Sequence, residues 1–153
     1  MKETGIREDQ LTIEITESTL METEGDVIAK LHAMKSLGLK LAIDDFGTGY
    51  SSLAYLKRFP INHLKIDREF VKDLPENTQD IAIARSIIKM AHELKIDVVA
   101  EGVENQSQLR FLKEASCNYG QGFHFGKPMP PAQFEEWLIH YNQQTHSHIR
   151  SIG

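Results

Sequence analysis

Two aspartates stand side by side at the end of an apolar segment. Asp44 and Asp45 follow Ala42 and Ile43, and two glycines and several hydroxyl residues come next. Adjacent carboxylates at the tip of a buried strand are costly to desolvate unless they are paired or bind a cation. The pair is therefore the first place where this chain could do chemistry.

Further ionisable residues stand near the carboxyl ends of neighbouring apolar segments. Lys65 and Asp67 share one face of HLKID, and Glu101 ends DVVAE. Glu14 lies deeper, between two isoleucines of LTIEIT. A single acid at a strand end is usually a helix N-cap or a solvated loop residue. Four successive segments that each supply an ionisable group fit that interpretation poorly, because such strand ends are where parallel sheets bind ligands.

If these groups converge, they form an uncompensated acidic cluster. Its members would be Glu14, Asp44, Asp45, Asp67 and Glu101, with Lys65 as the counter-charge. Such a cluster either takes up protons or binds cations. Oxygen ligands with no matching histidine or cysteine favour Mg²⁺ or Mn²⁺ over zinc. Paired aspartates suit a two-metal arrangement in which one carboxylate bridges both ions.

Other polar positions have simpler interpretations when taken alone. Glu17 and Glu104 are typical of solvated or helix-capping acids. Gly47 and Gly49 could cradle a phosphate, but two glycines between a strand and a helix more often only make the turn. These four residues gain a functional interpretation only from a wider pattern.

The elements that must position these groups alternate between strand and helix. Strands are expected at 11–16, 40–45, 63–67, 97–101 and 119–125, and helices at 24–38, 51–59, 80–95, 106–115 and from Pro130 or Pro131 to 142. This alternation predicts an α/β fold with a parallel sheet. Either an open doubly wound sheet or part of a (β/α)₈ barrel would fit, although a full barrel needs about 250 residues. The polar residues 143–153 are expected to form a flexible tail.

Composition excludes several classes of protein. The chain has 153 residues, 41% hydrophobic and 25% charged, which is typical of a soluble globular domain. A net charge of −5 argues against a nucleic-acid polymer as partner. No apolar run approaches the ~20 residues of a membrane span, so no membrane contact is expected. The single cysteine, Cys117, fits a reducing compartment and predicts a cytoplasmic location.

Five segments match, in order and spacing, the motifs of one known family. They are TIEITES (12–18), AIDDFGTGYSSL (42–53), LKIDREFV (64–71), VVAEGVE (98–104) and GQGFHFGKPMP (120–130). Together they resemble the later motifs of the EAL domain, a family of bacterial phosphodiesterases that hydrolyse cyclic di-GMP to pGpG. The resemblance implies a partial TIM-like (β/α) barrel of about five βα units, with residues 1–142 forming the C-terminal part of an EAL domain.

The resemblance also implies roles for individual residues. The ligands of two divalent cations would be Glu14, Asp44, Asp45 and Asp67. Asp44 would bridge the ions, while Lys65 and Glu101 would position and deprotonate the attacking water, with Glu101 as general base. Supporting residues would be Glu17, Glu104 and Gln121. The loop next to the substrate would contain Phe46, Gly47, Thr48 and Gly49.

Two features of the family are missing from this sequence. The Glu-Ala-Leu motif is absent, and so is an asparagine ligand from an earlier strand. By the barrel count about 100 residues and three strands are lacking. We therefore expect weak or no activity from this chain alone, and a homodimer or a partner that supplies the missing strands. The alternatives are a non-catalytic module that binds cyclic di-GMP or a partner and, less favoured, another metal-dependent barrel enzyme with Lys65 as base.

Overall fold

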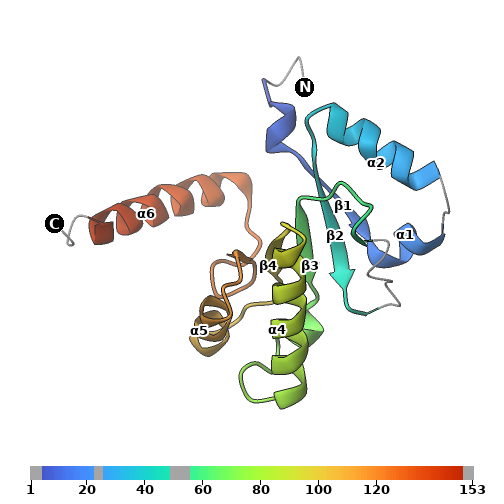
Figure 1. Cartoon of the computed structure of the whole chain (residues 1–153). Coiled ribbons are helices and arrows are strands. Elements are labelled where there is room, and N and C mark those ends of the chain that lie inside the picture. Colours follow the sequence, from blue (N-terminus) through green and yellow to red (C-terminus); the bar gives the residue numbers. More distant parts are fainter. Residues whose placement is uncertain (1–4, 23–25, 49–55, 150–153) are drawn as a thin grey trace.

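The computed structural model describes residues 5–22, 26–48 and 56–149 (Figure 1). The strands are β1 (Thr12–Thr16), β2 (Lys40–Phe46), β3 (His63–Ile66), β4 (Asp97–Ala100) and β5 (Tyr119–Gly120). The helices are α1 (Glu17–Glu22), α2 (Asp26–Ser36), α4 (Thr78–Glu93), α5 (Gln106–Glu114) and α6 (Pro131–Ile149), with 3₁₀ turns η1 (Glu8–Gln10) and η2 (Arg68–Phe70). The predicted alternation of strand and helix is confirmed.

The strands form a single parallel sheet in which sequence order is also spatial order. The order is β1-β2-β3-β4-β5, and every neighbouring pair is parallel. A doubly wound sheet would reverse its strand order at a switch point, which this sheet does not do. The order is that of consecutive units in a (β/α) barrel, so of the two architectures left open by the sequence the structure has the barrel type.

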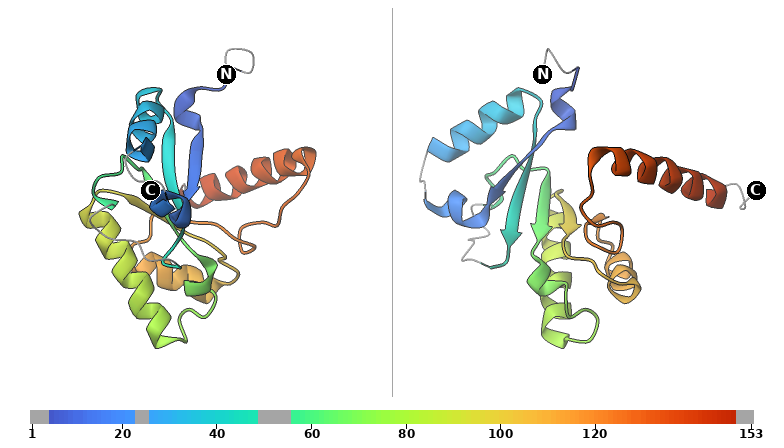
Figure 2. Two further views of the ribbon diagram at one scale, coloured as in Figure 1. Left: turned by 90° about the vertical axis from the view of Figure 1, so that its right-hand side faces the viewer. Right: turned by 180° about the vertical axis from the view of Figure 1, so that it is seen from behind.

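Apart from the end of β2, residues alternate between the two faces of the sheet. Leu41, Ile43, Leu64 and Ile66 are almost fully buried and face the helices. Figure 1 shows α4 lying across β3 and β4, and Figure 2 shows the same sheet from behind. Since side chains alternate along a strand, the residues between these, such as Lys65, point to the opposite face. The helix-covered core therefore fixes which face of the sheet receives the polar groups.

Two asparagine side chains form hydrogen bonds between the amino ends of neighbouring strands. Asn62, just before β3, accepts hydrogen bonds at Oδ1 from the Leu41 amide (3.1 Å) and from Lys35 Nζ (2.6 Å). Asn118, just before β5, accepts one at Oδ1 from the Val98 amide (2.8 Å). These bonds join strand starts that lie at the end of the sheet opposite the acidic groups.

Helix α1 and strand β5 differ from the prediction. Helix α1 was not predicted, because ESTLME is too short to show helical periodicity. Strand β5 covers two residues rather than 119–125. The chain turns after Gln121, where the Phe125 amide donates to the Gly122 carbonyl at 3.1 Å. The expected helix at 51–59 lies mostly outside the described residues.

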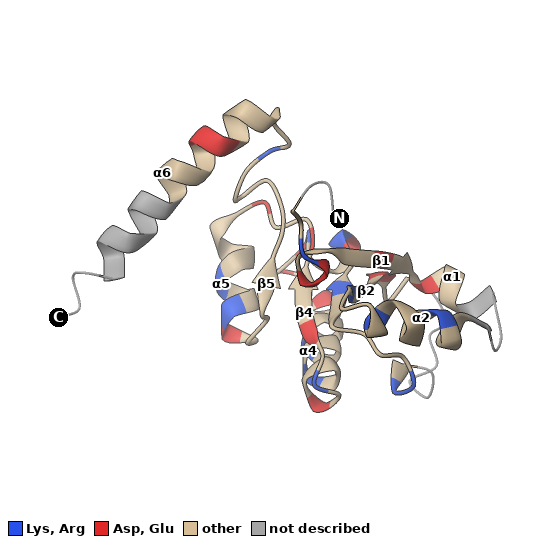
Figure 3. Ribbon diagram, turned by 90° about the horizontal axis from the view of Figure 1, so that it is seen from above, with Lys and Arg blue, Asp and Glu red and all other residues tan. Residues whose placement is uncertain are grey.

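Helix α6 is longer than expected and extends away from the sheet (Figure 3). It begins at Pro131, as predicted, but continues to Ile149 rather than ending at residue 142. No glycine or proline occurs between 143 and 149 to end it. Phe134, Trp137 and Tyr141 stack along one side of this helix. Among the described residues, none of the helices combines the length and apolar character that a membrane crossing requires.

The packing of α4 on the sheet gives a test of the core. Ile88 is 2% exposed, whereas Ile83 on the same helix is 37% exposed. Ile88→Ala should lower the free energy of unfolding by roughly 2–5 kcal/mol, because it leaves a cavity. The matched change Ile83→Ala should cost less than about 0.5 kcal/mol. Chemical denaturation of both variants would measure this, and equal losses would contradict the described packing.

Candidate active site

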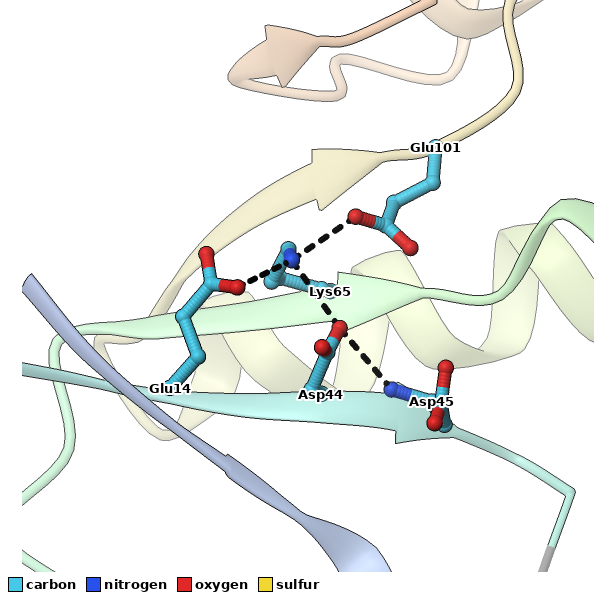
Figure 4. A network of polar contacts seen from close by, with 5 residues as sticks. All are labelled: Glu14, Asp44, Asp45, Lys65 and Glu101. Carbon is cyan, nitrogen blue, oxygen red and sulfur yellow. Dashed lines mark hydrogen bonds and ion pairs between the residues drawn. The ribbon is translucent and has the colours of Figure 1, made fainter.

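The ammonium group of Lys65 lies at the centre of the polar face of the sheet (Figure 4). Its Nζ is 2.8 Å from Glu14 Oε2, 3.0 Å from Asp44 Oδ1 and 2.8 Å from Glu101 Oε1. These partners come from β1, from β2 and from the end of β4. The predicted convergence of ionisable groups from successive strands is therefore present in the structure.

Lys65 is buried, and its partners are only partly covered. Its side chain is 6% exposed, against 48% for Glu14, 24% for Asp44 and 19% for Glu101. Burial alone would lower the pKa of the Lys65 ammonium, but the hydrogen bonds that it donates to Glu101, Glu14 and Asp44 outweigh burial and raise the pKa above its ordinary value. The three carboxylates thus stabilise the ammonium form of Lys65.

Asp45 has a left-handed backbone conformation beside Asp44. Its φ angle is 55°, in the left-handed region, and the pairing of β2 with β3 is irregular between Ile43 and Phe46. Its amide donates to Asp44 Oδ1 at 3.1 Å. This conformation is uncommon for non-glycine residues, although aspartate adopts it more readily than most. The irregularity brings both neighbouring carboxylates to the polar side of the sheet, although strict alternation would separate them.

The two aspartates and Glu101 form a group with the dimensions of a cation site. One ligand oxygen from each of Asp44, Asp45 and Glu101 lies within 4.8 Å of the others. Burial raises the pKa of the Asp45 carboxyl above its ordinary value, and the neighbouring carboxylates of Asp44 and Asp67 raise it further. A divalent cation would relieve this repulsion. The all-oxygen donor set fits Mg²⁺ or Mn²⁺.

Asp67 caps the 3₁₀ turn η2 and also lies next to the carboxylate of Asp45. Its carboxylate accepts a hydrogen bond from the Glu69 amide at 2.6 Å and caps η2. Its charge also acts on Asp45. The structure therefore places Asp67 beside Asp45, outside the group of three carboxylates that contact Lys65.

Glu17 contacts the loop after Asp45. Glu17 is 2% exposed, and its Oε2 accepts a hydrogen bond from the Gly47 amide at 3.0 Å. Gly47 has φ of 102°, and a Cβ there would lie 2.8 Å from Phe70 Cε2, so the position needs glycine. Thr48 Oγ1 donates to the Asp45 carbonyl at 2.9 Å. Phe46 belongs to the core rather than to an open surface, and Gly49 lies outside the described residues.

Glu104 and Gln121 line a pocket beside Glu101. Its volume is about 210 Å³, and its lining consists of Arg68, Glu101, Gly102, Glu104, Gln121, Gly122 and Phe123. The Gln121 amide donates to the Ala100 carbonyl at 2.8 Å, which fixes its backbone next to β4. Both predicted supporting residues thus lie near Glu101, but neither makes a described side-chain contact with the carboxylate group.

Two residues near the site were not singled out in the sequence. Arg68 lines the pocket, and Gln108 is a buried polar residue that contacts the loop after β4. The signal for Gln108 was available, because an asparagine followed three residues later by glutamine is typical of a helix capping box. Nothing in the sequence indicates that its side chain reaches a second loop.

Comparison with known proteins gives consistent results. The family model for the EAL domain matches residues 1–128. The chain is 45% identical over 153 residues to the cyclic di-GMP phosphodiesterase NbdA of Pseudomonas aeruginosa, covering 100% of this chain and 20% of that protein. It is 40% identical over 131 residues to the cyclic di-GMP phosphodiesterase PdeR of Escherichia coli, covering 86% of this chain and 20% of that protein. The chain therefore spans about a fifth of the length of these relatives.

Solved structures share the fold. The complex of the phosphodiesterase PaMucR with c-di-GMP has a TM-score of 0.83 at 42% identity, covering 87% of this chain and 54% of that one. The manganese and cyclic di-GMP complex of Klebsiella pneumoniae BlrP1 has a TM-score of 0.76 at 40% identity, covering 81% and 32%. The fold class expected from the sequence is confirmed by these similarities.

The charge balance around Lys65 can be tested directly. Lys65→Met should lower the free energy of unfolding at pH 7.5 by about 2 kcal/mol, because it leaves three carboxylates facing one another. Protonation of these carboxylates would remove their mutual repulsion, so the loss should be larger at pH 7.5 than at pH 5. Denaturation at pH 7.5 and pH 5 would measure both effects.

Lys89→Met, at an exposed position of α4, is the matched control and should change stability by less than about 0.5 kcal/mol at either pH. A loss for Lys65→Met that is independent of pH would contradict the proposed charge balance.

Proposed function

Because the chain belongs to the EAL domain family, we propose that it carries part of a phosphodiesterase site that hydrolyses cyclic di-GMP to pGpG. The observation that supports this most is the group formed by Asp44, Asp45 and Glu101 next to the buried Lys65 ammonium. An anionic diester cannot approach so acidic a surface unless cations neutralise the carboxylates. The similarity to relatives named as cyclic di-GMP phosphodiesterases supports the substrate.

The donor set supports two divalent cations, Mg²⁺ or Mn²⁺. When bound, they would supply charge neutralisation of the diester and activation of a water molecule. Asp44 would serve both ions, as the family resemblance implies, because its carboxylate lies in one group with those of Asp45 and Glu101. Asp45 and Asp67 would serve the second ion, and Glu14 the first. Glu104 and Gln121 would complete the surrounding shell from the pocket side.

Glu101 is the residue best placed to accept a proton. It is only 19% exposed, it lines the pocket, and one of its oxygens is held by Lys65 at 2.8 Å. The other oxygen is then free of that ion pair and can act as general base toward water in the pocket. Lys65 would orient Glu101 and offset negative charge that develops on the diester. Glu17 would keep the Phe46–Thr48 loop in place through the Gly47 amide.

The sheet edges support a partner that completes the barrel. Within the described residues, β1 and β5 each pair with only one neighbouring strand. Unpaired strand edges favour further strand addition. We therefore propose that full hydrolytic activity needs strands from a homodimer or from another partner, and that the chain by itself is weakly active. A second copy of this chain could cover the open strand edges but could not supply the Glu-Ala-Leu motif of the family, because this sequence lacks it. That motif would have to come from residues outside this sequence.

Release of pGpG from cyclic di-GMP with Mn²⁺ tests the proposed reaction. Turnover should be detectable, and Glu101→Gln should lower it by about 100-fold or more, because the proton acceptor is lost while shape is kept. Glu69→Gln, an exposed change outside the cluster, should leave the rate unchanged. Binding of cyclic di-GMP without hydrolysis by the wild type would instead favour a non-catalytic binding module.

Metal binding can be measured separately from hydrolysis. Asp44→Asn should lower the affinity for Mn²⁺ by at least about tenfold in calorimetric titration, since the central ligand loses its charge. Asp73→Asn, on the exposed loop before α4, is the control and should bind as the wild type does. Equal affinities for the two variants would remove Asp44 from the proposed ligand set.

A further inference from the structure

One buried polar side chain near the site has no part in the proposed chemistry. Among the described residues, the buried polar or charged side chains are Glu17, Lys65 and Gln108. Glu17 holds the loop after β2, and Lys65 pairs with the carboxylates. Gln108 is 2% exposed in the first turn of α5, where burial of an amide is costly unless both of its ends are hydrogen-bonded.

The Gln108 amide is satisfied at both ends, by two different loops. Its Oε1 accepts hydrogen bonds from the Glu104 amide (2.7 Å) and the Asn105 amide (3.1 Å), both in the loop after β4. Its Nε2 donates to the Lys72 carbonyl at 2.9 Å, in the segment that follows β3. The side chain therefore links the two loops across the carboxyl edge of the sheet.

These two loops carry residues of the candidate site. The loop after β4 begins with Glu101, and the segment after β3 begins with Asp67. They already touch near their start, because the Glu101 amide donates to the Ile66 carbonyl at 3.1 Å. A Cβ on Gly102 would lie 2.6 Å from Arg68 Cβ, so the backbones are as close as glycine permits. Gln108 supplies a second attachment farther along both loops.

We infer that Gln108 is a positioning residue, which holds the Glu101–Glu104 loop against the Asp67–Lys72 segment and thereby sets Glu101 relative to the other carboxylates. Two attachments, one at each end of the contact, prevent the rotation that a single attachment would allow. The effect on metal binding rests on the proposed function, whereas the effect on the loops does not.

Helix capping is the competing explanation for Gln108. It occupies the third position of α5 and forms a capping box with Asn105, whose Oδ1 accepts from the Gln108 amide at 3.0 Å. Capping uses only Oε1, and the link to Lys72 uses only Nε2. Glutamate is an equally good capping-box residue, but its carboxylate cannot donate to a carbonyl. Gln108→Glu therefore keeps the cap and removes the link.

Amide hydrogen exchange on the metal-free chain separates the two explanations. In Gln108→Glu, exchange of the Glu101 amide and of amides in residues 71–74 should speed up by roughly tenfold, because a cross-loop hydrogen bond is lost. Asn105→Ala removes the capping side chain and should speed exchange in the first turn of α5 while leaving those amides unchanged. Calorimetric titration with Mn²⁺ should show about tenfold weaker binding for Gln108→Glu.

Exchange at Glu101 and residues 71–74 within twofold of the wild type in Gln108→Glu would overturn the proposal. If circular dichroism shows that this variant does not fold, Gln108→Met, which is neutral and of similar length, is measured against Asn105→Ala with the same criteria. Absence of Mn²⁺ binding in the wild type would count against the proposed function. The exchange data would still decide the role of Gln108.

Discussion

The buried ammonium of Lys65 is the interaction on which the arrangement of the polar face depends. Its carboxylate partners stand at different heights along their strands. Glu14 pairs in register with Ala42, two residues before Asp44, and Lys65 pairs with Val99, two residues before Glu101. The two residues that are displaced along the strand direction, Glu14 and Glu101, are glutamates with longer side chains. Asp44, on the strand between those of Glu14 and Lys65, is the shorter aspartate. Side-chain length thus compensates for the stagger between parallel strands and lets one cation reach three acids.

The helix-covered side of the sheet makes this convergence possible. Because Leu64 and Ile66 are fully buried against the helices, Lys65 between them cannot turn away from the polar face without moving its neighbours. The same constraint acts on β2, where Leu41 and Ile43 anchor the strand up to Asp44. Only beyond that point does the pairing become irregular, and there Asp45 takes its positive φ. The core imposes alternation, and the site departs from it at a single residue.

Much of this arrangement could be predicted from the sequence. Acids at the ends of successive apolar segments indicated convergence, because parallel strands end at one edge of a sheet, and the structure brings Glu14, Asp44 and Glu101 around Lys65. The family and the fold class were also correct. Features set by tertiary contacts were not predictable: the early end of β5, where the chain turns after Gln121, and the second partner of the Gln108 side chain. The roles assigned to individual site residues stay predictions.

The asparagines before β3 and β5 reveal how the sheet is assembled. Asn62 bonds the amide of the second residue of β2 and a lysine of α2, the helix before that strand. Asn118 bonds the amide of the second residue of β4 and contacts His92 Nε2 of α4 at 2.9 Å. The same connection thus occurs twice, two strand–helix units apart. In both α2–β2–β3 and α4–β4–β5, the start of the middle strand is therefore fixed to the helix before it as well as to the strand after it.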